Sequence, residues 1–73
     1  MKYYFCPELP GTVECFLKIN DKDEVISAYL CQDTLFHRGG YWFQANKHDT
    51  RYFRLHKDKH RELTYSEIFV ETL

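Results

Sequence analysis

Short apolar segments separated by turn-forming residues recur along this 73-residue chain, at a spacing of about ten residues. The turn-forming breaks are rich in Pro, Gly, Asn and Asp; they fall at residues 6–11, 20–24, 37–40 and 46–50. The segments between them have strand character; they cover residues 2–6, 12–19, 25–31, 41–45 and 51–57. This pattern is typical of an antiparallel meander, so we expect most of the chain to form one β-sheet.

Two of these segments indicate how the sheet is buried. In residues 12–19 the apolar side chains alternate with others, which places one set on a single face of the strand: Val13, Cys15, Leu17 and Ile19. Residues 25–31 are apolar on both faces, as expected of a central strand.

The C-terminal segment carries signals of a helix. Thr64 and Glu67 have the spacing of a capping box, and Leu63 and Ile68 stand where a hydrophobic staple places its two residues. The apolar face of that helix would consist of Tyr65, Ile68, Phe69, Thr72 and Leu73. The competing interpretation is a last strand, in which Tyr65, Glu67, Phe69, Glu71 and Leu73 alternate. We predict an α+β fold: a four- or five-stranded antiparallel β-sheet (meander) with a short C-terminal helix packed on one face.

Length and composition indicate one globular domain, residues 1–73, near the lower size limit for folding on a hydrophobic core. Thirteen aromatic residues supply large areas to bury and argue against disorder. The odd number of cysteines (Cys6, Cys15, Cys31) gives no disulfide framework, and we interpret all three as small apolar residues on strands. No apolar run approaches the ~20 residues of a membrane span, and the N-terminus lacks a signal peptide. These features predict an unprocessed, cytoplasmic protein.

Charge is distributed unevenly along the chain, although the net charge is only −1. Residues 47–61 hold six Lys or Arg against two acids, whereas residues 62–73 hold three Glu and no basic residue. The chain therefore has one basic band, followed by an acidic end.

The basic band adjoins aromatic residues. If 41–45 paired with 51–57 as strands, alternation would direct one apolar set inward: Tyr41, Phe43, Ala45, Phe53 and Leu55. Trp42, Gln44, Tyr52, Arg54 and His56 would face the other way. We predict a partner-binding surface centred on Trp42, Tyr52 and Arg54, with Arg51, His56, Lys57 and Arg61 at its rim. The alternative is that Trp42 and Tyr52 are covered, by the helix or by Phe36, and the basic residues are merely solvated.

Such a surface suits two classes of partner. Mixed charge is compatible with a larger protein, which this chain would inhibit or adapt. The alternative is a nucleic acid bound by the same face, but binders of that class are usually basic overall. Small size, the lack of catalytic motifs and outward aromatics are common among phage and mobile-element accessory proteins that block a larger host machine. An open sheet edge would also allow a homodimer.

Enzymatic and metal-binding functions have weaker support. His and Lys in residues 56–61, with Tyr52 and Arg54, would suit a small ribonuclease-type toxin, but that chemistry needs a basic groove. His56 and His60 have a zinc-like H-x3-H spacing, yet the cysteines are separated by eight and fifteen residues. We therefore predict no catalytic residues, no metal site and no cofactor.

Overall fold

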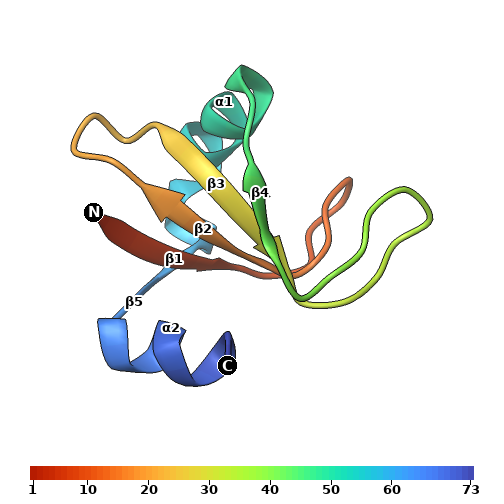
Figure 1. The fold of residues 1–73 in the computed structure, drawn as a ribbon. Helices are drawn as coiled ribbons and strands as arrows, with labels where there is room; N and C mark the ends of the chain where they lie inside the picture. Colours follow the sequence, from red (N-terminus) through yellow and green to blue (C-terminus); the bar gives the residue numbers. More distant parts are fainter.

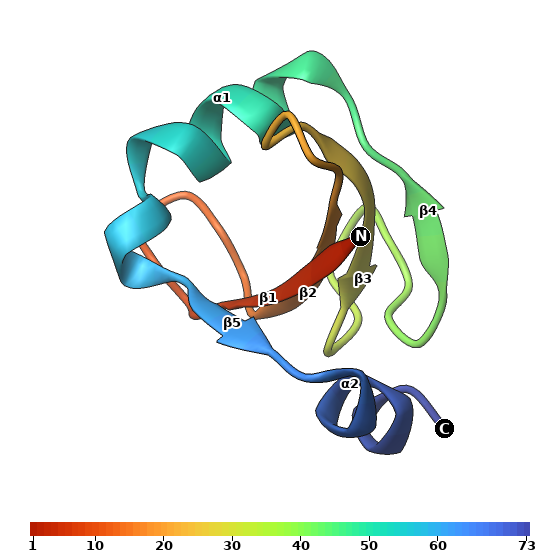
Figure 2. The same ribbon diagram turned by 90° about the vertical axis from the view of Figure 1, so that its left-hand side faces the viewer.

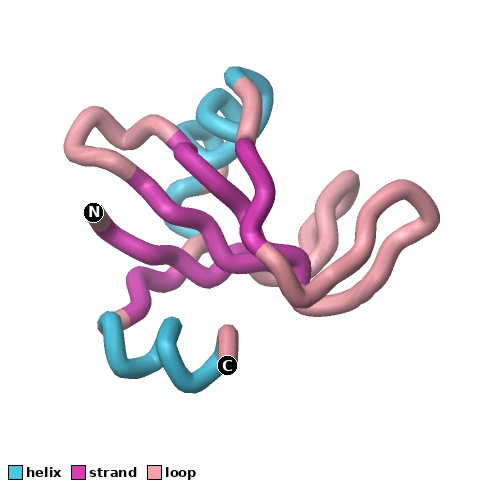
Figure 3. Tube along the Cα trace, in the orientation of Figure 1, coloured by secondary structure: helices cyan, strands magenta, loops and turns pink.

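A computed structural model describes the whole chain, residues 1–73. Five strands, two α-helices and one 3₁₀ turn follow one another along the sequence (Figure 1, Figure 3). In order they are β1 (Lys2–Cys6), β2 (Cys15–Ile19), β3 (Val25–Leu30), β4 (Trp42–Gln44), α1 (Lys47–Leu55), η1 (Lys57–Lys59), β5 (Arg61–Leu63) and α2 (Tyr65–Glu71). None of the helices has the length and apolar character needed to cross a membrane.

The strands form one antiparallel sheet in the order β4-β3-β2-β1-β5. The first four strands are a meander, and the chain then crosses by way of α1 to add β5 beside β1. Figure 2 shows the sheet curving between the two helices, with α1 against one face and α2 against the other. The predicted α+β class, with a five-stranded antiparallel sheet and a short C-terminal helix, is confirmed.

The larger core lies between the sheet and α1. The alternation predicted for residues 12–19 is confirmed, because Cys15, Leu17 and Ile19 are buried there and Val13 packs against them. Ile19 and Phe53 have no exposed surface, and Phe53 is the only buried residue of α1. Phe53 therefore anchors the helix to the sheet.

The strand predicted over residues 51–57 is wrong, since α1 occupies most of that range. The polar break at 46–50 is the start of a helix: the Asn46 side chain accepts hydrogen bonds from the backbone N–H groups of His48 and Asp49. The Asp49 carboxylate accepts one in return from the Asn46 N–H, at 2.8 Å, which completes a capping box. Leu55, predicted to face inward beside Phe53, is 72% exposed, because two residues on a helix turn through about 200°.

The C-terminal helix and its predicted cap are confirmed. The Thr64 hydroxyl accepts from the Glu67 N–H, and the Glu67 carboxylate accepts from the Thr64 N–H. Leu63 and Ile68 are buried together with Phe16, in a second and smaller core on this side of the sheet. The predicted apolar face differs from the observed one, because only Ile68 of that face is buried.

Three of the four predicted turn-forming breaks lie in connections between strands, and one cysteine differs from expectation. In the turn at 20–24, the Asn20 side-chain oxygen accepts from the backbone N–H groups of Lys22 and Glu24. In the paired glycines, Gly40 has a φ of +89° and Gly39 lies against the backbone of Gln32 and Leu30. Cys6 and Cys15 are buried strand residues, as predicted, whereas Cys31 lies just past the end of β3 and is exposed.

Candidate functional site

The sheet separates the residues that the sequence placed on one contact surface. Trp42 lies on the α2 side, with its ring 5.4 Å from Tyr29 and 5.8 Å from Tyr3 between centroids. Tyr52 and Arg54 belong to α1, which covers the opposite face (Figure 2). The structure therefore does not bring Trp42, Tyr52 and Arg54 together on one surface, and the reason is the helix at residues 47–55.

Two residues of the predicted contact surface are engaged within the molecule: Arg54 from its centre and Lys57 from its rim. Arg54 donates to the backbone oxygen of Lys22 at 2.8 Å, and Lys57 donates to Asp23 at 2.9 Å. These contacts tie α1 and η1 to the turn at 20–24. The Lys57 ammonium holds the pKa of Asp23 below its ordinary value, and Asp23 raises the pKa of Lys57.

The other residues of the predicted contact surface are distributed over two faces. Tyr52 packs on the ring of His56, with centroids 4.3 Å apart, and Arg51 is exposed on α1. Arg61 lies in β5 and pairs with Glu67 of α2 at 3.0 Å. A hydrogen bond from the Thr64 N–H, together with Arg61, lowers the pKa of Glu67.

On the α2 side, four aromatic side chains cross the sheet in one line. Phe5 is opposite Phe16, Phe16 is opposite Tyr29, and Tyr29 is opposite Trp42. Successive ring centroids are 6.0, 5.8 and 5.4 Å apart, which is contact distance for aromatic rings. We call these four residues the aromatic row. At the start of β5, Arg61 extends the same line beside Phe5.

Helix α2 covers the aromatic row only partly. Ile68 is buried against the sheet, while Tyr65, Phe69, Val70 and Leu73 are 66%, 67%, 63% and 86% exposed. Tyr65 fixes the start of the helix, because its hydroxyl donates to the backbone oxygen of Met1 at 3.0 Å. The helix thus presents an apolar surface outward that nothing else in the chain covers.

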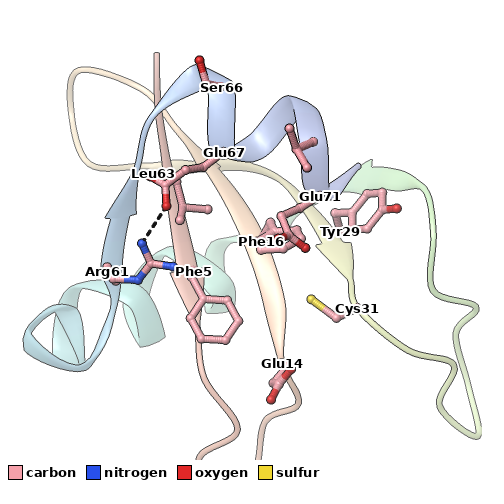
Figure 4. Close-up of a pocket in the computed structure, with 11 residues that line it drawn as sticks. Phe5, Glu14, Phe16, Tyr29, Cys31, Arg61, Leu63, Ser66, Glu67 and Glu71 are labelled. Atoms are coloured by element: carbon pink, nitrogen blue, oxygen red, sulfur yellow. Dashed lines mark hydrogen bonds and ion pairs between the residues drawn. The ribbon is translucent and has the colours of Figure 1, made fainter. Parts of the chain in front are cut away.

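A groove lies on one side of α2, between the helix and the aromatic row (Figure 4). It has a volume of about 600 Å³, and Phe5, Phe16 and Tyr29 of the aromatic row line it together with Leu63 and Val70. Its charged residues are three glutamates and one arginine: Glu14, Glu67, Glu71 and Arg61. We call it the acidic groove.

The charge of the acidic groove is only partly neutralised within the molecule. Arg61 is paired with Glu67, as the dashed line in Figure 4 marks. The one other ion pair of the chain joins Lys57 to Asp23, so Glu14 and Glu71 have no cationic partner. The groove therefore combines an aromatic lining with two free carboxylates.

A second groove lies on the other side of α2 and is nearly all apolar. Tyr3 and Trp42 line it from the sheet, and Tyr65, Ile68 and Phe69 line it from the helix. Val70 lines both grooves, so the exposed surface of α2 forms the ridge between them. Together, the aromatic row, the ridge and the two grooves form one continuous surface.

The basic residues of α1 make a separate surface on the opposite face. A shallow groove there is lined by Lys47, Arg51 and Arg54, with Glu24 and the neutral residues of β3 and the helix start. Aromatic side chains are missing from this groove, so the predicted mixture of aromatic and cationic groups is absent there.

The chain shows no group of three or more His, Cys, Asp or Glu side chains placed to hold a metal ion. Comparisons with protein-family models, with curated proteins and with solved structures returned no match to this chain. The surface chemistry is therefore the only basis for a functional proposal.

Sequence reasoning missed the aromatic row, although its signal was present. Phe16 falls on the opposite face from Leu17 and Ile19, and residues 25–31 are apolar on both faces. Taken together, these patterns indicate a second apolar face. Which aromatics align across it depends on strand register, which the sequence does not supply.

Proposed function

We propose that this protein is a small non-enzymatic binding module that captures an apolar, positively charged segment of a larger protein. The observation that carries the proposal is the exposed apolar ridge of α2 beside the aromatic row. A helix that buries one residue and leaves three apolar side chains exposed gains little from folding alone. Contact with a partner would cover that surface.

The chemistry of the acidic groove indicates the kind of segment. The groove is lined by Tyr29, and tyrosine is among the residue types enriched at the centres of protein interfaces. Glu14 and Glu71 lack cationic partners, so a bound segment with Lys or Arg beside its apolar residues would supply them. By occupying such a segment, the module would act as an inhibitor or an adaptor, as phage accessory proteins do.

The test is selection from a displayed library of random peptides on the immobilised protein. We expect enriched peptides to combine aliphatic or aromatic residues with Lys or Arg. Phe69→Ala should weaken a selected peptide about 30-fold, which corresponds to ~2 kcal/mol at an interface hot spot. Leu55→Ala is the matched control, because Leu55 is an equally exposed apolar residue on α1, across the sheet.

A charge reversal tests the acidic groove separately. Glu71→Lys should weaken the same peptides, and Asp58→Lys, the same change in the exposed η1 turn, should not. Peptides that bind Phe69→Ala and Leu55→Ala equally well would refute the α2 surface. Peptides that lose affinity in Phe69→Ala but lack Lys and Arg would refute the charge argument alone.

Nucleic-acid binding by the α1 surface is the second candidate. Lys47, Arg51 and Lys59 are exposed there without an ion-pair partner, whereas Arg54, Lys57 and Arg61 are engaged within the molecule. Three free cations would neutralise about three phosphates, a small number for a sequence-independent binder. Arg51→Glu should abolish binding to a single-stranded oligonucleotide if this candidate holds, while Phe69→Ala should leave it unchanged.

A further inference from the structure

Two cysteines and a histidine come together inside the larger core. Cys6 and Cys15 are directly opposite each other in the β1–β2 pair, where the ladder ends at the 7–14 connection. Their exposed fractions are 2% and 9%, and that of His60, which follows η1, is also 9%. His60 is the only buried polar residue of the chain, so its surroundings decide what it can do.

The tautomer of His60 follows from its one hydrogen bond. Nδ1 lies 2.7 Å from the backbone oxygen of His56, and because a carbonyl oxygen only accepts, Nδ1 must carry the hydrogen. In the neutral ring, Nε2 is then a bare acceptor. Nε2 is buried and has no hydrogen-bond partner. A buried acceptor without a donor is costly, so Nε2 is an atom that would readily accept a proton. His60 also packs on Phe53 and is near enough to Cys6 to help lower its pKa.

The two thiols are not equivalent. The neighbouring Cys15 thiol, acting as a donor toward the Cys6 sulfur, and the nearby His60 lower the pKa of Cys6 to about 6. The same pairing, together with burial, raises the pKa of Cys15. In its protonated form the Cys6 thiol donates to the backbone oxygen of Pro7, at 3.5 Å. Partial desolvation, together with the charge of Glu14, raises the pKa of Cys31, although this residue is largely exposed. Of the two thiols, Cys6 therefore loses its proton first, and the Cys15 thiol beside it stays protonated.

We infer that Cys6 and Cys15 form a reversible oxidation site, which a small peroxide converts to an intrachain disulfide with His60 as the proton acceptor. Opposed residues of an antiparallel pair have Cα atoms about 4.5–5.5 Å apart, within the range that a disulfide spans. Because both thiols are almost fully buried, the site would admit a small oxidant rather than a large substrate.

The reaction balances with hydrogen peroxide as the oxidant. Nε2 of His60 accepts the Cys6 proton, and the Cys6 sulfur attacks one peroxide oxygen, so that an S–O bond forms and the O–O bond breaks. The departing hydroxide takes the proton from His60 and leaves as water. The Cys15 sulfur then displaces the hydroxyl from the Cys6 sulfur, and that hydroxyl leaves as water with the Cys15 proton. Two thiols are oxidised and one peroxide is reduced to two waters.

The test is a competition among the three cysteines of the native chain. Trypsin places Cys6 and Cys15 on one peptide, residues 3–18, and Cys31 on another, residues 23–38. After limiting peroxide and alkylation under denaturing conditions, peptide 3–18 should be unalkylated and lighter by two hydrogen atoms. Cys31 should remain alkylated, and dithiothreitol should restore alkylation of peptide 3–18.

Two comparisons test whether oxidation of Cys6 and Cys15 depends on the folded structure and on His60. In the native chain, peptide 3–18 should be oxidised faster than Cys31. Unfolding in urea before the peroxide step should reduce this ratio of rates several-fold, because Cys6 returns to an ordinary thiol pKa of ~8.5. His60→Gln should slow oxidation of peptide 3–18 several-fold in the native chain, but not in urea. Faster oxidation of Cys31 than of peptide 3–18 in the native protein would overturn the inference. An equal ratio of the two oxidation rates before and after unfolding would also overturn the inference.

Discussion

Helix α1 is anchored by one side chain, and replacing that side chain tests the helix directly. Phe53 has no exposed surface, and its ring packs against Tyr4 and His60, with centroids 5.0 and 5.2 Å away. Truncating a buried Phe to Ala costs ~3–5 kcal/mol, from lost burial and from the cavity that remains. A chain of 73 residues is stable by only ~4–11 kcal/mol in total, so Phe53→Ala should lose a large part of its stability.

Leu55 is the informative partner of this experiment. On a sheet, Phe53 and Leu55 would face the same way, and truncating either would destabilise the chain comparably. On α1, Leu55 is 72% exposed, so Leu55→Ala should change stability by no more than ~0.5 kcal/mol.

The assay is urea unfolding followed by far-ultraviolet circular dichroism. Phe53→Leu, which retains most of the buried volume, provides a folded variant should Phe53→Ala be unfolded throughout. A Leu55→Ala variant destabilised by ~2 kcal/mol or more would refute the helix and restore the strand.

Three further predictions address the cap, a loop and the pH dependence of stability. Thr64→Ala should cost ~0.5–2 kcal/mol in urea unfolding, while Thr64→Asp should be close to neutral; the reverse order would contradict the α2 cap. Gly39→Ala should lower the melting temperature, because its Cβ would lie 2.8–2.9 Å from backbone atoms of Gln32 and Leu30, whereas an unchanged value would mean that the loop adapts. Folding lowers the pKa values of Asp23 and Glu67 below 3.8 and 4.5, so their contribution is present at neutral pH and lost as the pH falls through the folded-state values. The urea midpoint should therefore decrease in that acidic pH range, and Glu67→Gln should make the decrease smaller. A Glu67→Gln variant with the same dependence of the midpoint on pH would refute the role given to Glu67.

The sequence predicted the first half of the fold and the last helix well, because there the local signals agree with the final packing. Val13, Cys15, Leu17 and Ile19 alternate on a strand whose face toward the larger core is buried along its length. Thr64 and Glu67 cap a helix whose staple, Leu63 and Ile68, is buried. In these segments, short-range pattern and long-range contact require the same residues.

Residues 46–61 were misjudged because two periodicities fit them. Phe53 and Leu55 read as one face of a strand, yet Asn46 and Asp49 already have the three-residue spacing of a capping box. The Asn and Asp that mark a turn also mark a helix start, and only the tertiary contact of Phe53 with the sheet decides between them.

The candidate site was harder to predict than the fold, because it depends on register. Trp42 was correctly placed away from Phe43 and the larger core, but its neighbours were taken from α1. Its true neighbours, Tyr3 and Tyr29, belong to strands distant in sequence. Exposure of Phe69 was also not predictable, since a periodic apolar face gives no information on how much sheet remains to cover it.

The pairing of β1 with β5 has a consequence for how the chain is made. The Tyr4 hydroxyl donates to Glu62, a residue 58 positions later, at 3.4 Å. During synthesis, β1 can pair with β2 early, but its other edge stays open until residues 61–63 have been translated. Such distant pairing slows folding, because a long loop must close before the contact forms. The nascent chain therefore carries an open strand edge and an uncovered aromatic face through most of its translation, and this interval is when it is most exposed to aggregation.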